Sequence, residues 1–228
     1  MRHIVKTSPP QEFIDYKKTP GVSFEGLSGD PKRALRQQLL EDQGYICCYC
    51  GKRIYNDNHT KIEHIKCQAN YGGLALDYNN MLASCDGGEN DRSNGAAHQI
   101  HCDAKKGNQE IPLSPLDKDI ENTLSFFEDG TVKGKGEKGK ELIRVLGLDA
   151  EFLNTERRNA IEQYELCWPQ NLEEELSLLK QKDNGYYDEF CFVLEQYIRD
   201  LIKERDEEEQ KDIDTTTKVV SAKYINRL

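Results

Sequence analysis

Apolar residues three and four positions apart predict a helix early in the chain. Asp30 is a favourable N-cap, and Pro31 suits the first helical position. The apolar stripe of residues 34–40 continues the helix to about Gln43, and Gly44 ends it. The preceding residues, 1–30, are rich in Pro and Gly and carry scattered apolar side chains, so they predict an ordered arm laid over a surface, or else a docking segment.

Shorter patterns predict a small antiparallel unit in the next part of the chain. β-Forming runs and turn residues predict a hairpin at 45–55, a strand at 61–65, a turn at 77–80 followed by a short apolar run, and a short helix at 101–106. Residues 86–100 are polar and rich in glycine, which predicts an inserted loop.

The second half of the chain is predicted to be mainly helical. Asp129-Gly130 between β-forming residues predicts a hairpin near 125–133. Lys133 to Lys140 is predicted to be a flexible basic loop that either grips a nucleic-acid backbone or merely connects elements. Apolar periodicity then predicts four helices, roughly at 138–146, 150–166, 170–183 and 187–210. The fold class is therefore α+β, divided into an arm and helix (1–43), a core (44–110) and a helical region for partner docking (111–228).

The distribution of charge along the chain constrains which partners the protein can bind. The net charge of −10 has the wrong sign for a protein that binds nucleic acid unaided. The excess lies in residues 111–228, which hold 27 acidic and 17 basic residues, whereas the first 110 are nearly neutral. We therefore expect a partner to supply most of the phosphate contacts.

The apolar pattern also bears on the cellular compartment. It contains no apolar run of about 18 residues, so no membrane span is expected. The chain lacks the apolar start of a signal peptide, so we expect a cytoplasmic protein without a membrane partner. In that compartment, eight cysteines favour metal binding over disulfides.

Four of these cysteines have the spacing of a zinc site. Cys47 and Cys50 form a C-x-x-C knuckle, which can hold one side of a tetrahedral Zn²⁺, and Cys85 and Cys102 can close the site. This zinc would hold the fold and do no chemistry. The remaining cysteines are interpreted as small buried apolar residues: Cys48, Cys67, Cys167 and Cys191.

The segment between the two cysteine pairs carries the candidate chemistry. Glu63-His64-Ile65, Asn80 before the run that ends in Cys85, and Cys102-Asp103-Ala104-Lys105-Lys106 together resemble the HNH endonucleases. That resemblance covers about residues 44–108 and implies a zinc-stapled ββα-metal core. A longer match includes the opening MRHIVKTSPP, LRQQLLEDQGYICCYCGKRI and LIRVLGLD. It resembles the HNH proteins of Septu and retron-linked anti-phage defence systems, closest to the PtuB type.

The resemblance implies hydrolysis of DNA phosphodiester bonds. His64 is the candidate general base, because imidazole titrates near neutral pH. The resemblance makes Glu63 a ligand of a catalytic Mg²⁺ or Mn²⁺ and makes Asn80 the residue that orients His64. Neighbouring side chains on a strand point to opposite faces, so a kink or bulge is expected if Glu63 and His64 are to act together.

The third motif departs from the usual Cys-His-x-x-Lys pattern of the family. Asp103 stands where the histidine is usual, and as a hard oxygen donor it suits Mg²⁺. His101, on the other side of Cys102, is the alternative ligand. Lys105 and Lys106 either touch phosphate or are merely solvated, and His59 and His98 are expected to be exposed.

The resemblance also implies partners and leaves alternatives. It implies a PtuA-type ATPase that gates the activity, and perhaps a retron with its reverse transcriptase and msDNA. The unusual Asp103 and the net charge of −10 keep open a catalytically idle zinc adaptor. An RNA or tRNA nuclease is a third possibility, because the same core can act on RNA.

Overall fold

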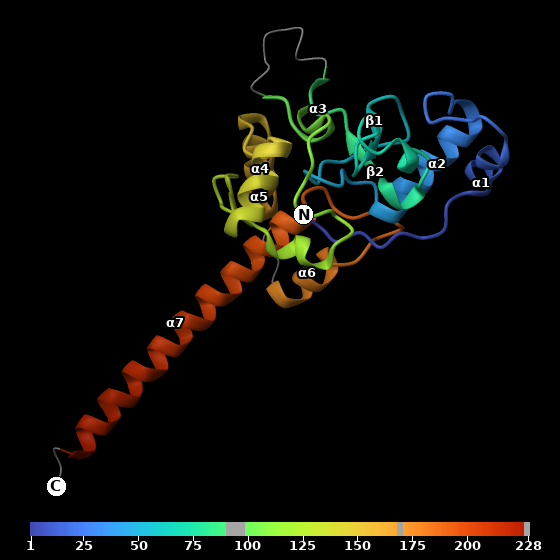
Figure 1. Cartoon of the computed structure of the whole chain (residues 1–228). Helices are drawn as coiled ribbons and strands as arrows, with labels where there is room; N and C mark the ends of the chain where they lie inside the picture. The colour runs from blue at the N-terminus through green and yellow to red at the C-terminus, as the bar shows by residue number, and fades with distance from the viewer. Residues whose placement is uncertain (90–98, 168–170, 226–228) are drawn as a thin grey trace.

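The computed structural model describes residues 1–89, 99–167 and 171–225. These residues form α-helices and two small antiparallel sheets, which confirms the α+β class (Figure 1). The helices and strands are α1 (Gln11–Lys18), α2 (Gly29–Gln43), β1 (Thr60–His64), β2 (Met81–Cys85), α3 (Cys102–Lys106), β3 (Leu124–Phe126), β4 (Val132–Gly134), α4 (Gly136–Leu146), α5 (Glu151–Leu166), α6 (Leu172–Leu179) and α7 (Cys191–Ile225). No helix in these ranges is both long and apolar enough to cross a membrane.

The strands β1 and β2 form an antiparallel ribbon between α2 and α3 (Figure 1). Their register runs unbroken from the Thr60–Cys85 pair to the His64–Met81 pair. The predicted strand and the apolar run are therefore confirmed to within a residue. A 3₁₀ turn at Tyr78–Asn80 leads into β2, and the Asp77 side chain accepts a hydrogen bond from the backbone N–H of Asn79.

The predicted first helix is confirmed as α2. It begins at Gly29 with Ser28 as its N-cap, so the prediction of Asp30 as N-cap and Pro31 as first helical residue is wrong, since both lie within the first turn. It ends at Gly44, whose φ of 62° is the left-handed conformation of a glycine C-cap. Its apolar stripe buries Leu35 and Leu39 completely. Because α2 packs on α1 and β2, the N-terminal end of this helix is held beside the ribbon.

The cysteine knuckle is a tight turn that packs on the start of α7. The Cys47 N–H donates to the Lys52 carbonyl, and Ile46 pairs with Arg53 in an antiparallel bridge, as expected of a hairpin. Gly51 at the turn has a φ of 84°, and a Cβ there would lie 2.7 Å from the ring of Phe192. Glycine is thus required both by the backbone conformation and by the contact.

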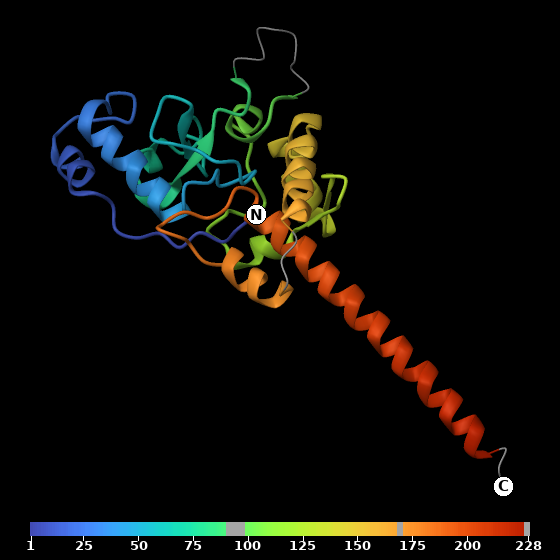
Figure 2. The same ribbon diagram turned by 180° about the vertical axis from the view of Figure 1, so that it is seen from behind.

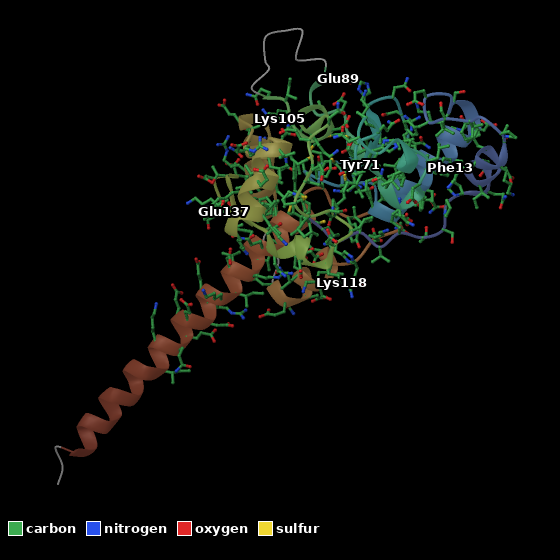
Figure 3. The ribbon with its side chains drawn as sticks, in the orientation of Figure 1. Phe13, Tyr71, Glu89, Lys105, Lys118 and Glu137 are labelled. Atoms are coloured by element: carbon green, nitrogen blue, oxygen red, sulfur yellow. The ribbon has the colours of Figure 1, made fainter. Side chains whose placement is uncertain are left out.

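The N-terminal segment is an ordered arm, which fits the first of the two interpretations. Met1 and Ile4 are buried, and Phe13 of α1, a helix not predicted from the sequence, is completely buried (Figure 3). Lys6 Nζ donates to the Tyr78 and Met81 carbonyls, both at 2.5 Å. The arm is therefore attached to the turn that enters β2.

The region after residue 111 contains the predicted hairpin and helices. The hairpin β3–β4 turns at Gly130, but the predicted flexible loop at 133–140 is wrong, since Gly134 ends β4 and Gly136 begins α4. Gly139 explains the difference: a Cβ there would lie 2.1 Å from the Thr123 carbonyl oxygen, so only glycine lets the backbones pack this closely.

The helix α7 extends well beyond its predicted end at residue 210. Its first turns pack against α5 and α6, where Cys191, Val193 and Ile198 are buried in a second apolar cluster. The remainder projects away from the body, on the side opposite α1, as both views show (Figures 1 and 2). The division into regions at residues 43 and 110 stays a prediction, because the main cluster of buried side chains joins residues from Met1 to Leu153.

Candidate active site

Four buried cysteines form a site that can hold one metal ion. The sulfur atoms of Cys47, Cys50, Cys85 and Cys102 all lie within 4.8 Å of one another. The Cys47–Cys102 and Cys50–Cys85 sulfur pairs are each 3.8 Å apart. Tetrahedral Zn²⁺ with bonds of about 2.3 Å requires sulfur–sulfur distances of about 3.8 Å. The four cysteines therefore fit a structural zinc ion.

Three separate elements bring these sulfur atoms together. Cys47 and Cys50 come from the knuckle, Cys85 ends β2, and Cys102 begins α3. The Cys85 N–H donates to Cys47 Sγ at 3.3 Å, an interaction that favours the thiolate form a metal requires. Cys102 has a φ of 50°, an uncommon conformation for a non-glycine residue. The cluster thus ties the knuckle and β2 to α3.

A cleft of about 660 Å³ lies beside this cluster, between the N-terminal end of α2, β1 and α3. Its lining includes the candidate base His64 and the candidate metal ligands Glu63 and Asp103. The expected kink between Glu63 and His64 is absent, because the β1–β2 register is unbroken through both residues. His64 is the last residue of the strand, so the cleft reaches both side chains around the end of the ribbon.

Glu63 is held at the floor of the cleft by two donors. Tyr49 Oη donates to Glu63 Oε1 at 2.9 Å, and Lys106 Nζ lies 2.8 Å from the same oxygen. Lys106 also donates to the His64 carbonyl at 2.8 Å and is only 1% exposed, so the interpretation of this lysine as solvated is wrong. Lys105 is the exposed member of the pair and lies at the surface near α4 (Figure 3). A carboxylate has about four lone-pair positions, so Glu63 keeps capacity for a cation.

Asp103 and His101, the two alternative metal ligands, line different cavities. Asp103 lines the cleft and is close enough to Glu63 for their carboxyl groups to interact. Burial, and then the proximity of Glu63, raise the pKa of Asp103 to about 8. His101 instead lines a different hollow, where Nδ1 bonds to the Gln99 carbonyl at 2.9 Å and the ring stacks on Phe152. Asp103 shares the cleft with Glu63 and His64, and His101 does not.

His64 is held in one tautomer by its contacts. Nε2 lies 3.0 Å from the Ala75 carbonyl, which can only accept, so Nε2 carries the proton. Nδ1 is then an acceptor, and the Gln68 amide lies 3.3 Å away as its donor. The ring also meets the edge of Phe24 at 4.5 Å between centroids. Burial lowers the pKa of His64, which favours the neutral form.

Asn80 holds the loop that follows His64. Its Oδ1 accepts the Lys66 N–H at 2.8 Å, and its Nδ2 donates to the Lys66 carbonyl at 2.9 Å and the Leu74 carbonyl at 3.3 Å. Because the Ala75 carbonyl follows directly after Leu74, this amide fixes the loop that orients the imidazole. Asn80 is buried and has the contacts expected of a positioning residue.

The cleft also has a basic wall that the sequence analysis missed. Lys32, Arg33 and Arg36 line it from the first turns of α2, and Lys61 lines it from β1. With Lys106 these residues outnumber the two acidic lining residues, in a chain whose net charge is −10. The spacing of Lys32, Arg33 and Arg36 along a helix was visible in the sequence, but nothing local indicated which cavity this helix would face.

The remaining histidines and the cysteines outside the cluster can be compared with their predicted exposure. His59 is exposed, with Nδ1 3.2 Å from Asp86, whereas His98 lies outside the described residues. Cys48 and Cys191 are buried as predicted, and Cys67 is buried beside the cleft. Cys167 is exposed, so its interpretation as a buried residue is wrong. It caps the end of α5, where the chain leaves the apolar cluster.

No protein-family profile matches the chain. Two curated proteins are similar to it. The first, "Retron Ec83 putative HNH endonuclease" from Escherichia coli, is 26% identical over 244 residues, which cover 88% of this chain and 95% of that protein. The second, "Retron Vc95 putative HNH endonuclease" from Vibrio cholerae serotype O1 biovar El Tor, is 27% identical over 174 residues, which cover 68% and 79%. These relatives confirm the resemblance of the chain to retron-linked HNH endonucleases.

Proposed function

We propose that this protein is a cytoplasmic, metal-dependent HNH endonuclease that hydrolyses DNA phosphodiester bonds. The observation that carries the proposal is the meeting of His64, Glu63 and Asp103 in one basic-walled cleft. Both relatives are named HNH endonucleases, which supports the same class of reaction. The basic wall supports a polyanionic substrate, because lysine and arginine side chains neutralise phosphates.

The chemistry of the donors fits a hard divalent cation. Glu63 and Asp103 bring two carboxyl groups together, and their proximity raises the pKa of Asp103. A bound cation would relieve this repulsion and allow both groups to be ionised. Oxygen donors of this kind suit Mg²⁺ or Mn²⁺. We therefore assign Glu63 and Asp103 as the ligands of the catalytic metal and the four cysteines as the ligands of structural zinc.

In this mechanism, His64 Nδ1 accepts a proton from the water that attacks phosphorus in line with the leaving oxygen. The hydrogen bond from Nε2 to the Ala75 carbonyl leaves Nδ1 as the unprotonated nitrogen and stabilises the imidazolium that forms. The Gln68 amide, which donates to Nδ1 at 3.3 Å, must give up this contact when the water binds there. Lys106 holds the Glu63 carboxylate and the His64 carbonyl in a fixed relation. The bound cation would stabilise the charge that develops on the phosphate and on the leaving oxygen.

The proposal is tested by incubating the full chain with supercoiled plasmid and with tRNA, each with added Mg²⁺ or Mn²⁺. We expect metal-stimulated nicking of the plasmid. Cleavage of tRNA alone would assign the cleft to RNA. If neither nucleic acid is cut, even when the co-expressed partner is present, the catalytically idle zinc adaptor is the better account.

We further propose that the protein acts in anti-phage defence with a PtuA-type ATPase, in a retron of the Septu-like kind with its reverse transcriptase and msDNA. The retron names of both relatives support this setting. The acidic second half of the chain supports docking on a larger basic partner. Co-purification of the tagged chain with proteins encoded beside it tests the assembly directly.

Asp103→Ala is expected to lower metal-dependent cleavage by about 100-fold or more, because it removes one of two carboxylate ligands. His101→Ala should retain most of the activity, since His101 lines a different hollow. Asp103→His restores a ligand of the softer imidazole type, and we expect activity with Mn²⁺ to recover more than activity with Mg²⁺. Plasmid nicking rates in each metal check these three variants. If His101→Ala loses its nicking activity and Asp103→Ala keeps it, His101 is the metal ligand and Asp103 is not.

Replacing Lys32 and Arg33 together by alanine is expected to weaken DNA binding without changing the residues at the cleft floor. Two lost phosphate contacts should reduce the slope of log affinity against log salt by about 1.8. Anisotropy of a labelled duplex, measured between low and moderate salt on a His64→Ala background, gives this slope. Lys17→Ala with Lys18→Ala on α1 is the matched control, outside the residues that line the cleft. If the Lys17, Lys18 variant loses as much DNA affinity as the Lys32, Arg33 variant, the basic wall of the cleft is not the DNA-binding surface.

A further inference from the structure

A second groove lies beside the first half of α7. This helix leaves the body away from β1, the strand that carries Glu63 and His64 (Figure 1). The groove has a volume of about 540 Å³ and is formed by the β3–β4 hairpin, α5 and the first half of α7. It shares no lining residue with the cleft that holds His64. The nuclease mechanism leaves this groove without a role.

The rim of the groove is strongly acidic. Glu128 and Asp129 come from the turn of the hairpin, and Asp200, Glu204 and Glu207 come from α7. Lys203 is the one basic residue among those that line it. Asp200, Glu204 and Glu207 are four and three residues apart, so they form a single stripe along the helix. The groove therefore presents a row of carboxylates to whatever occupies it.

The floor of the groove is apolar. Ile161, Val193 and Tyr197 are buried at its base, and the partly exposed Leu201 continues the apolar surface along α7. Phe127 on the hairpin is 41% exposed, so its ring is accessible at the edge of the groove. An apolar floor between acidic margins can take apolar anchors and cationic flanks at the same time.

The length of the groove suits a helix. From Val193 to Glu207 the wall formed by α7 spans about 21 Å, at about 1.5 Å per residue, which equals roughly four helical turns. A helix with apolar residues on one face and basic residues on both sides would place its anchors over Tyr197 and Leu201. Its cations would then meet the carboxylates of Asp200 and Glu204.

We propose that this groove binds a cationic amphipathic helix of a partner protein. Charge complementarity selects this occupant: the carboxylates repel nucleic acid, and a second copy of a chain with net charge −10 would be repelled as well. The inference rests on the groove alone. Binding of the helix is independent of nuclease activity, so His64→Ala should leave the affinity for the helix unchanged.

The test uses a labelled leucine–lysine peptide of about four helical turns as the probe and fluorescence anisotropy with the full chain at physiological salt. We expect saturable binding that Asp200→Lys with Glu204→Lys weakens by about tenfold or more. The matched control is Glu12→Lys with Asp15→Lys, which makes the same change in net charge on exposed positions of α1, on the far side of the body (Figures 1 and 2).

A second pair of variants tests the apolar floor. Phe127→Ala should weaken peptide binding severalfold, whereas Phe152→Ala should not, although Phe152 has a similar exposure of 39% and lies outside the groove. Absence of peptide binding would overturn the proposal, and so would equal losses in the groove and α1 charge variants. A dimer in sedimentation that dissociates in the Asp200→Lys, Glu204→Lys variant would assign the groove to a second copy and overturn it too.

Discussion

Replacement of His64 by alanine is expected to abolish DNA cleavage, with a rate loss of about 10²- to 10⁴-fold, the usual contribution of a general base. The reason is geometric: Nε2 is bonded to the Ala75 carbonyl, so Nδ1 is the ring nitrogen that can take a proton. Alanine leaves no group in this position. The measurement is the initial rate of plasmid nicking by wild type and variant in Mg²⁺ and in Mn²⁺.

Fold and metal content must be measured on the same His64→Ala samples, because the imidazole is buried and packs on Phe24. We expect one zinc per chain in both proteins and a small change in melting temperature. His59→Ala, at an exposed histidine outside the cleft, is the control and should cut like wild type. Undiminished cleavage by His64→Ala would show that another group is the base.

The second large effect is expected from Cys47→Ser, which should cost the protein its zinc and the fold of its core. Binding of structural zinc by small domains is worth about 10–16 kcal/mol. The whole stability of a domain is about 5–15 kcal/mol. Since Cys47, Cys50, Cys85 and Cys102 join the knuckle, β2 and α3, loss of the ion should separate these elements. Hydrogen exchange across residues 44–106 and zinc content by mass spectrometry measure both consequences.

Cys48→Ser is the matched control for this experiment. Cys48 is buried next to Cys47 but is outside the four-cysteine cluster, so its serine variant should keep one zinc per chain. Chelation of the wild-type protein should reproduce the exchange pattern of Cys47→Ser. A Cys47→Ser protein that retains full protection across the core would mean that the cluster does not stabilise the fold through a metal.

Several features of this protein were determined by its sequence alone. The helix α2, the strand that ends at His64 and the hairpin about Gly130 follow from patterns of apolar and turn residues that act over a few positions. The C-x-x-C knuckle predicted a metal site because its two thiols are constrained by their own turn. Asn80 was placed as a positioning residue through the family resemblance, and its hydrogen bonds to Lys66 and Leu74 support that role.

Other features were decided only by the tertiary structure, because they depend on residues far apart in the chain. Whether Asp103 or His101 faces Glu63 depends on how α3 packs against the ribbon, because these two residues flank Cys102 and line different cavities. Lys106 is buried because the carboxylate of Glu63, from another element, compensates its charge. The basic wall of α2 and the acidic groove beside α7 likewise arise when separate elements pack together. No local pattern contains that information, since burial and the local field are properties of the assembled fold.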